Sequence, residues 1–245
     1  MFRPEYLALA LCTAALPLPA TAGAWKHPVD GGFAATSFTL RRSDQGLVSE
    51  FGFYRDFGVS PHFDLGIDLT HQGSQRVGLP GRHSGQQSGH VLVFARLPLR
   101  QGASKTQIAA ELALGSNHTN LLWHPMYRVS LSAGRSKATQ HGNLWGNLDL
   151  IYEQRGDAPH PLWKVNGSFG LDSNRRVSPL LQIETSFGRD TDLSYSLTPS
   201  LRIKLAGFSF AGKQRFENSE LTIGLEYRRA NTQSLGLKIA LWQRF

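Results

Sequence analysis

Apolar and polar side chains alternate with a period of two residues through most of the chain after residue 24. In the last segment, Leu235, Leu237, Ile239 and Leu241 occupy every second position, and Phe245 ends the chain in the same phase. Successive side chains of a β-strand point to opposite faces, so this pattern predicts strands with one apolar face. No apolar run after residue 24 reaches the roughly 18 residues of a membrane helix. The sequence therefore predicts an all-β chain.

Twelve segments of this kind are separated by clusters of Gly, Asn, Asp, Ser and Pro, and no helix or linker interrupts them. Ten or fourteen strands remain alternatives, because Phe208 and Phe210 alternate inside the long connection Ala206–Ser219. Pro199 removes a ladder hydrogen bond, and an irregularity is expected there. The twelve strands are expected near residues 34–42, 47–57, 62–71, 89–99, 105–115, 126–135, 143–153, 162–171, 179–188, 194–205, 219–229 and 234–245.

The arrangement of aromatic residues favours a transmembrane antiparallel up-and-down β-barrel over a soluble periplasmic β-sandwich or barrel, which would also alternate. In lipid, only a closed barrel pairs every backbone group of a sheet. The apolar face carries one charge, Arg55, near a strand end. With both termini in the periplasm, the long connection 71–89 lies outside, and aromatic residues form an outer and an inner girdle. The outer girdle comprises Tyr127, Tyr152, Trp163, Phe187, Tyr195 and Tyr227, and the inner girdle comprises Phe63, Phe169 and Phe245.

The first 24 residues have the pattern of a secretory signal peptide. Arg3 precedes a mainly apolar stretch, and Ala20-Thr21-Ala22 forms a cleavage motif, with Ala22-Gly23-Ala24 as the neighbouring option. We therefore expect a signal peptide over 1–24 and one barrel domain over 25–245, with a mature start at Gly23 or Trp25. Cys12 lies in the signal, so the barrel is expected to fold without disulfides.

Three stretches of the chain resemble a group of porin-like, functionally uncharacterised bacterial outer-membrane β-barrel proteins. They are the start Trp25…Gly31-Gly32-Phe33, the hairpin Phe53-Tyr54…Phe57-Gly58-Val59…Leu65-Gly66-Ile67-Asp68-Leu69, and the ending Leu235-Gly236-Leu237-Lys238…Leu241-Trp242-Gln243-Arg244-Phe245. The terminal aromatic resembles the signal read by the outer-membrane barrel assembly machinery, although Gln243 replaces the usual aromatic two residues earlier. The resemblance implies the fold, a Gram-negative outer-membrane location and Phe245 as assembly signal, and it implies no activity.

The chain carries a net charge of +8, but export and the absence of a continuous basic stripe argue against nucleic acid as a partner. Charges on the inward phase nearly cancel, whereas the surplus positive charge lies in loops and strand ends. The inward charges are acidic on the second, third and seventh strands and basic on the tenth and twelfth. They predict either a selective lumen with a transverse field or a polar wall that only keeps the lumen wet. The candidate lumen charges are Arg96, Arg128, Arg202, Lys204, Lys238, Asp64, Asp68 and Asp149.

No catalytic, cofactor or metal site is predicted. A lipid hydrolase would need a Ser–His pair on the outer surface, and Ser116 lies two strands from His71. Several histidines are expected on the outer rim without ligand spacing: His71, His83, His90, His118, His124 and His160. We therefore expect a non-enzymatic, passive channel for small polar or anionic solutes in contact with outer-membrane lipids and lipopolysaccharide. The alternative is a closed structural or assembly barrel that binds lipopolysaccharide or an envelope partner.

Overall fold

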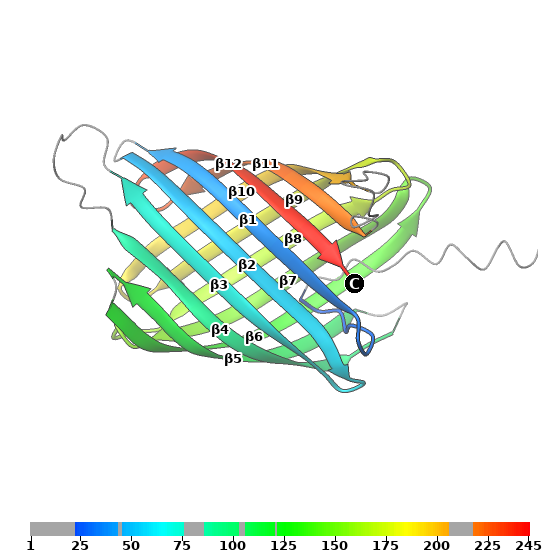
Figure 1. Cartoon of the computed structure of the whole chain (residues 1–245), viewed down its shortest axis with the longest axis horizontal. Helices are drawn as coiled ribbons and strands as arrows, with labels where there is room; N and C mark the ends of the chain where they lie inside the picture. Colours follow the sequence, from blue (N-terminus) through cyan, green and yellow to red (C-terminus); the bar gives the residue numbers. More distant parts are fainter. Residues whose placement is uncertain (1–22, 44–45, 76–85, 103–105, 121, 206–217) are drawn as a thin grey trace, which may run out of the picture.

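Twelve antiparallel strands form one closed barrel in a computed structural model of the chain (Figure 1). The structure describes residues 23–43, 46–75, 86–102, 106–120, 122–205 and 218–245. Each strand pairs with its neighbours in sequence, and β1 closes on β12, so the topology is up-and-down. The strands are β1 Gly32–Ser43, β2 Gly46–Ser60, β3 Phe63–Gln75, β4 Gln87–Arg100, β5 Gln107–Thr119, β6 Leu122–Thr139, β7 Gly142–Arg155, β8 Leu162–Asp172, β9 Val177–Gly188, β10 Thr191–Lys204, β11 Ser219–Arg229 and β12 Gln233–Arg244.

The predicted fold class and the count of twelve strands are confirmed. The largest difference lies between β5 and β6, where we expected a connection over 116–125 and both strands instead continue almost to residue 121. The polar run after Gly115 hides this extension in the sequence. Inside the barrel, Asn117 donates a hydrogen bond to Asp157, which gives the extended strand a polar partner (2.9 Å). The possible extra strand at 208–210 lies outside the described residues.

The barrel wall is apolar on its outer surface and polar on its inner surface. Outward side chains such as Val93, Leu114 and Leu225 are more than half exposed. Inward side chains such as Arg202, Glu153 and Asp64 are almost fully buried. This distribution is the reverse of that in a soluble barrel and is the one expected when lipid covers the outside. Among the described residues, no helix is long and apolar enough to cross a membrane.

Aromatic residues of the outer surface contact one another at the strand ends opposite to the chain termini. Tyr152 packs between Tyr127 and Trp163, with ring centroids 6.1 and 5.2 Å away. Tyr195 lies 6.2 Å from Tyr227 on the neighbouring part of the wall. These contacts match the predicted outer girdle, because such amphipathic rings favour the membrane–water interface.

The C-terminal residue closes the opposite end of the barrel. Phe245 exchanges two backbone hydrogen bonds with Gly32, at 2.8 and 3.1 Å. Its ring fits over Gly32, where a Cβ atom would lie 2.7 Å from the ring. The guanidinium group of Arg55 lies over the same ring, 4.9 Å from its centroid. The single charge predicted on the apolar face therefore has an aromatic partner at the rim.

Pro199 interrupts the ladder without shifting its register. Thr198 and Pro199 are missing from the β10–β11 pairing, yet Leu197 pairs with Tyr227 and Ser200 with Gly224 in the same register. A missing N–H explains the gap, because proline cannot donate to a ladder. The register shift in β10 lies instead near the start of the strand, between Thr191 and Ser194, in its pairing with β9.

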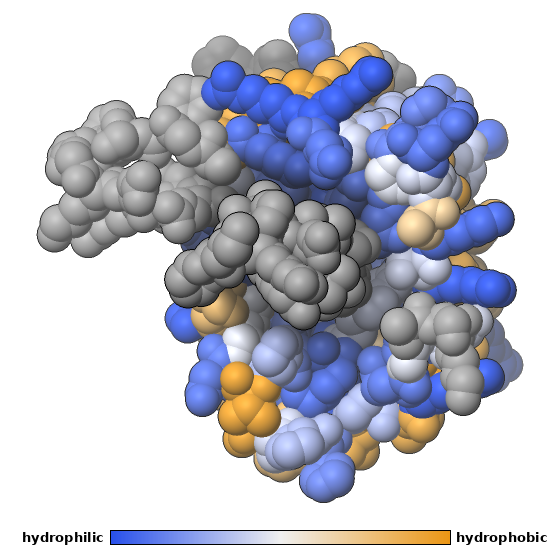
Figure 2. All heavy atoms as spheres, turned by 90° about the vertical axis from the view of Figure 1, so that its right-hand side faces the viewer, coloured by the Kyte–Doolittle hydropathy of each residue, from blue (hydrophilic) through white to orange (hydrophobic). Residues whose placement is uncertain are grey.

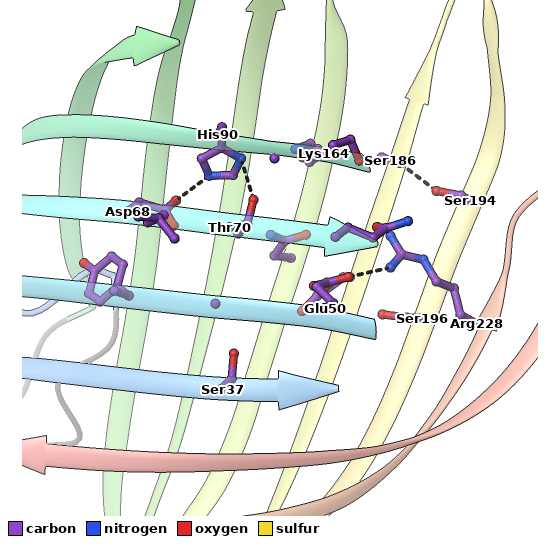
Figure 3. Close-up of a pocket in the computed structure, with 18 of the residues that line it drawn as sticks. Ser37, Glu50, Asp68, Thr70, His90, Lys164, Ser186, Ser194, Ser196 and Arg228 are labelled. Carbon is purple, nitrogen blue, oxygen red and sulfur yellow. Dashed lines mark hydrogen bonds and ion pairs between the residues drawn. The ribbon is translucent and has the colours of Figure 1, made fainter. Parts of the chain in front are cut away.

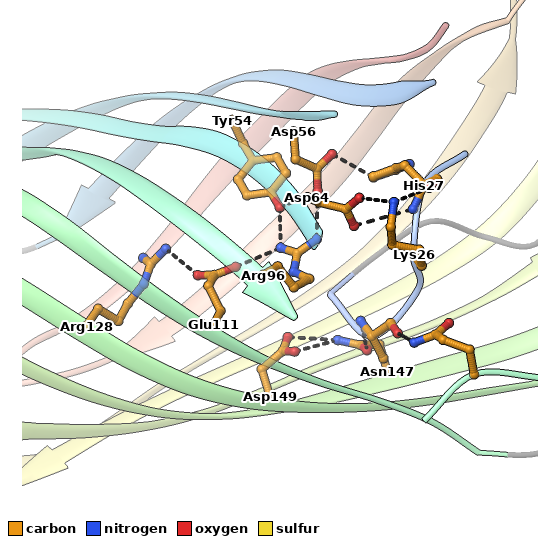
Figure 4. A network of polar contacts seen from close by, with 12 residues as sticks. Lys26, His27, Tyr54, Asp56, Asp64, Arg96, Glu111, Arg128, Asn147 and Asp149 are labelled. Carbon is orange, nitrogen blue, oxygen red and sulfur yellow. Dashed lines mark hydrogen bonds and ion pairs between the residues drawn. The ribbon is translucent and has the colours of Figure 1, made fainter. Parts of the chain in front are cut away.

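The segment before β1, residues 23–31, enters the lumen at the end where the C-terminus lies (Figures 1 and 4). Trp25 packs edge-on against Trp145, with ring centroids 6.4 Å apart. Lys26 forms an ion pair with Asp64 (2.6 Å), and His27 contacts Asp56 (2.8 Å). We call residues 23–31 the inner segment. Polar residues cover much of this end of the molecule (Figure 2).

Candidate functional site: the lumen

The half of the lumen that lies away from the chain termini contains a cavity of about 530 Å³, which we call the outer cavity (Figure 3). Its charged side chains come from seven strands because inward positions of neighbouring strands converge there. The cavity is lined by three acidic and four basic side chains: Glu50, Asp68, Glu184, Arg155, Lys164, Arg228 and Lys238. A space of this size and polarity can hold water and small hydrophilic solutes.

Contacts within the outer cavity leave several charges only loosely paired. Asp68 is the exception, because Arg128 binds it at 2.6 Å, and it also lies 3.4 Å from His90, whose other ring nitrogen bonds Thr70 Oγ1 at 2.9 Å (Figure 3). Arg228 is 3.7 Å from Glu50 and 32% exposed. Lys238 is 3.7 Å from Glu184, which is 47% exposed. Pairs with this spacing and exposure can exchange partners with a passing ion at little cost.

A second cavity of about 300 Å³, the inner cavity, adjoins the first. The two cavities share the lining residues Ala35, Ser37, Tyr54 and Lys238. The charged lining of the inner cavity consists of Arg96, Arg128, Lys238, Arg244, Glu111 and Asp149. Gly23 of the inner segment also lines it, so the N-terminal part of the described chain bounds this cavity.

Arg96 is the centre of a polar network on the β2–β6 side of the lumen (Figure 4). Its guanidinium group donates to Asp56 at 2.7 Å, to Glu111 at 2.8 Å and to the hydroxyl of Tyr54. Arg128 continues the network by donating to Asp68 at 2.6 Å and to Glu111 at 3.3 Å. Because Asp56 also contacts His27, this network joins the wall to the inner segment.

Arg202 occupies a comparable position on the opposite wall. Its side chain is 1% exposed and bonds Asp172 and Glu220, the latter at 3.2 Å. Its guanidinium group also lies over the rings of Trp145 and Trp242, at 5.5 and 5.7 Å from their centroids. The buried cation is thus held by carboxylates and aromatic faces together.

The eight predicted lumen charges all lie on inward strand positions but do not form one site. Asp68 and Lys238 line the outer cavity, whereas Arg96, Arg128 and Asp149 line the inner cavity together with Lys238. Three others are engaged nearer the inner end: Asp64 with Lys26, Arg202 with Asp172 and Glu220, and Lys204 with the carbonyl of Ser173 at 2.6 Å.

The predicted segregation of charge is resolved by local pairing. The acids of β2 and β3 bind cations from β1, β4, β6 and the inner segment, and Glu153 of β7 binds Arg155 and Lys164 at 2.7 and 2.6 Å. Opposite charges on neighbouring strands cancel at short range, which leaves little for a field across the lumen. The sequence did not predict that Lys26 and His27 contact the lumen acids, because both residues precede the first strand and lie in a segment without apolar–polar alternation.

The predicted histidines of the outer rim separate into two faces. His90 faces the lumen, whereas His71 lies on the outer surface with its Nδ1 atom 3.4 Å from Nε2 of His118. Ser116 is separated from His71 by β4. His83 lies outside the described residues. Within the described part of the chain, no three His, Cys, Asp or Glu residues are grouped so that they could hold a metal ion.

Comparison with known proteins shows the fold. No protein-family model and no curated protein matches the sequence. An outer-membrane channel of the COG4313 group from Pseudomonas putida F1 matches with a TM-score of 0.58 at 11% identity, over 92% of this chain and 100% of that one. The KdgM porin in complex with a disordered oligogalacturonate matches with a TM-score of 0.54 at 10% identity, over 86% of this chain and 99% of that one. The β-domain of the Bordetella autotransporter BrkA matches with a TM-score of 0.53 at 17% identity, over 88% of this chain and 99% of that one. The chain has the fold of porin-like outer-membrane β-barrels.

Proposed function

We propose that the protein is a passive diffusion channel for small polar or anionic solutes in the outer membrane of a Gram-negative bacterium. The observation that carries this proposal is the lumen itself, which combines two adjoining polar cavities with an apolar outer wall. In this location the wall contacts lipid and lipopolysaccharide, and Phe245 is presented to the barrel assembly machinery during folding.

The charge of the cavity lining supports a modest preference for anions. Taken together, seven basic and five acidic side chains line the two cavities in the described chain. The basic ones are Arg96, Arg128, Arg155, Lys164, Arg228, Lys238 and Arg244. The acidic ones are Glu50, Asp68, Glu111, Asp149 and Glu184. A surplus of two positive charges attracts anions weakly, and salt screens exposed members of the set.

A structural neighbour supports the same class of solute. KdgM, which has this fold, was solved with a disordered oligogalacturonate, a chain of acidic sugars. At 10% identity this likeness concerns the architecture, so the lining of the present chain has to carry the solute preference itself.

The alternative is a closed structural or assembly barrel. Two observations favour it: the Arg96 network joins six side chains on one wall, and the inner segment extends into the lumen from the inner end. A structural barrel of this kind would bind lipopolysaccharide or an envelope partner through its outer surface and pass no solute.

Solute uptake into liposomes separates the two functions. Protein-containing vesicles loaded with a pH-insensitive, anion-quenched dye should show chloride entry faster than empty vesicles. Arg228→Gln should slow this entry because Arg228 lines the outer cavity, whereas Arg229→Gln should not, because the neighbouring Arg229 is exposed outside it. Entry rates equal to those of empty vesicles would favour the closed barrel, and equal effects of both substitutions would refute a role of the lumen charge.

A further inference from the structure

We propose that the leader is cut before Gly23 and that the new α-ammonium group of Gly23 pairs with Asp149 inside the lumen. In this step water adds across the Ala22–Gly23 peptide bond, with an envelope signal peptidase as catalyst. Ala22 keeps the carboxylate, and Gly23 gains the amine, which is protonated at neutral pH. The proposal requires export of the chain but does not depend on whether the lumen conducts.

Gly23 is placed directly against Asp149. A Cβ atom at Gly23 would lie 2.7 Å from Asp149 Oδ1 and 2.8 Å from the amide nitrogen of Asn147. The amino nitrogen shares the same Cα atom, so it lies within about 5 Å of the carboxylate and can close that distance by rotation of a free terminus. A side chain at this position would collide with Asp149 and Asn147, so glycine fits here.

Asp149 lacks the cation that the other acids of the lumen have. Asn147 donates to both of its carboxylate oxygens at 2.8 Å, but no basic side chain of the described residues forms an ion pair with it. Three other inward acids, Asp64, Asp68 and Glu153, each have a cation within 3 Å. A carboxylate held in the lumen without a cation is costly, and an ammonium group removes that cost.

The residues between the two possible cleavage positions are part of the docked structure. Ala24 is fully buried, its backbone N–H donates to Asn147 at 3.3 Å, and its carbonyl accepts from Gln101 at 3.1 Å. A cut before Trp25 would remove both hydrogen bonds and the buried Ala24, and it would move the new charge away from Asp149. The structure therefore distinguishes between two starts that the sequence leaves open, and it selects Gly23.

The first test is the mass of the protein as isolated from the envelope. Full-length chain expressed with its leader in a Gram-negative host should give an intact mass, and an N-terminal peptide, that begin at Gly23. A start at Trp25, or a retained leader, would overturn the proposal.

The second test is the proton affinity of the terminal amine. Reductive methylation with ¹³C-formaldehyde labels the α-amine, and its NMR shift against pH gives its pKa. An ordinary α-amine titrates at about 7.7–8.0, and we expect a rise of about one unit, a tenfold gain in proton affinity. Asp149→Asn should abolish the rise, whereas Glu184→Gln, which removes another lumen carboxylate, should preserve it. An ordinary pKa in the unsubstituted protein, or the same rise in Asp149→Asn, would contradict the ion pair.

The amine titration also separates this proposal from the channel function. A raised pKa in a barrel that passes no current would support the ion pair and refute the channel. An ordinary pKa in a conducting barrel would do the opposite.

Discussion

Replacement of the buried Arg96 by Met should destabilise the barrel far more than replacement of the loosely paired Lys238 by Met. The side chain of Arg96 is 5% exposed and pairs with Asp56 and Glu111 at 2.7 and 2.8 Å. Removal of one partner from a buried ion pair costs about 3–5 kcal/mol because the other charge stays buried. Asp56 keeps His27 and Glu111 keeps Arg128, so we expect the lower end, about 3 kcal/mol.

The measurement is urea unfolding of the barrel in lipid vesicles, followed by tryptophan fluorescence and by loss of the heat-modifiable gel band. With a slope of about 1–3 kcal/mol per molar urea, the midpoint should fall by about 1–3 M. Lys238→Met is the matched control, because its 3.7 Å pair with the half-exposed Glu184 contributes about 0–1 kcal/mol.

A triple variant tests the reasoning further. Replacement of Arg96 together with its two acidic partners, by Arg96→Met with Asp56→Asn and Glu111→Gln, removes the uncompensated charges and should recover part of the lost stability. Equal urea midpoints for Arg96→Met and Lys238→Met would refute this role of the Arg96 network. A triple variant whose loss of unfolding free energy equals the sum of the losses of the three single variants would refute it as well.

Three further predictions concern the ends and the wall of the barrel. Deletion of Phe245 should lower the outer-membrane level of folded protein far more than Gln243→Ala, because Phe245 closes the barrel on Gly32; equal levels on heat-modifiable gels would contradict this. Gly66→Val should destabilise the barrel by about 1–3 kcal/mol in urea, because a Cβ atom would lie 2.2 Å from the ring of Phe94, and an unchanged midpoint would show that the wall relaxes. Burial would raise the pKa of Asp157, but hydrogen bonds from Asn117 and Thr119 hold it below its usual value. The contacts made by Asp157 should thus persist above pH 4 and be lost as the pH falls below it, seen as faster proteolysis of the 156–161 loop, a pH effect that Asp157→Asn should remove.

The sequence predicted the barrel well because two independent signals agree along the wall. Alternation places Phe63, Ile67 and Leu69 of β3 on one face. Girdle aromatics such as Tyr152 and Trp163 mark where strands meet the membrane interface. Both signals are local in the sequence, so they can be recognised without knowing which strands are neighbours. The polar end of β5 could not be predicted, because its alternation ends at Gly115 while its pairing with β6 continues.

The arrangement inside the lumen was much harder to predict. Inward charges such as Arg96 and Asp68 were identified from phase alone, but phase does not say which acid each cation meets. The partners depend on register and on a segment without alternation, since Lys26 pairs with Asp64, 38 residues away in the chain, and His27 contacts Asp56, 29 residues away. The role of Gly23 in bounding the inner cavity likewise appears only when the barrel is closed.

Current through a planar lipid bilayer tests most directly whether this barrel is a membrane channel with a weakly cationic lumen. Addition of purified protein should give stepwise conductance. The reversal potential should indicate anion preference at 0.1 M mean salt, and this preference should fade at 1 M, because the screening length falls from about 10 to about 3 Å. Absence of any current from correctly folded protein, or cation preference at low salt, would contradict the proposed channel.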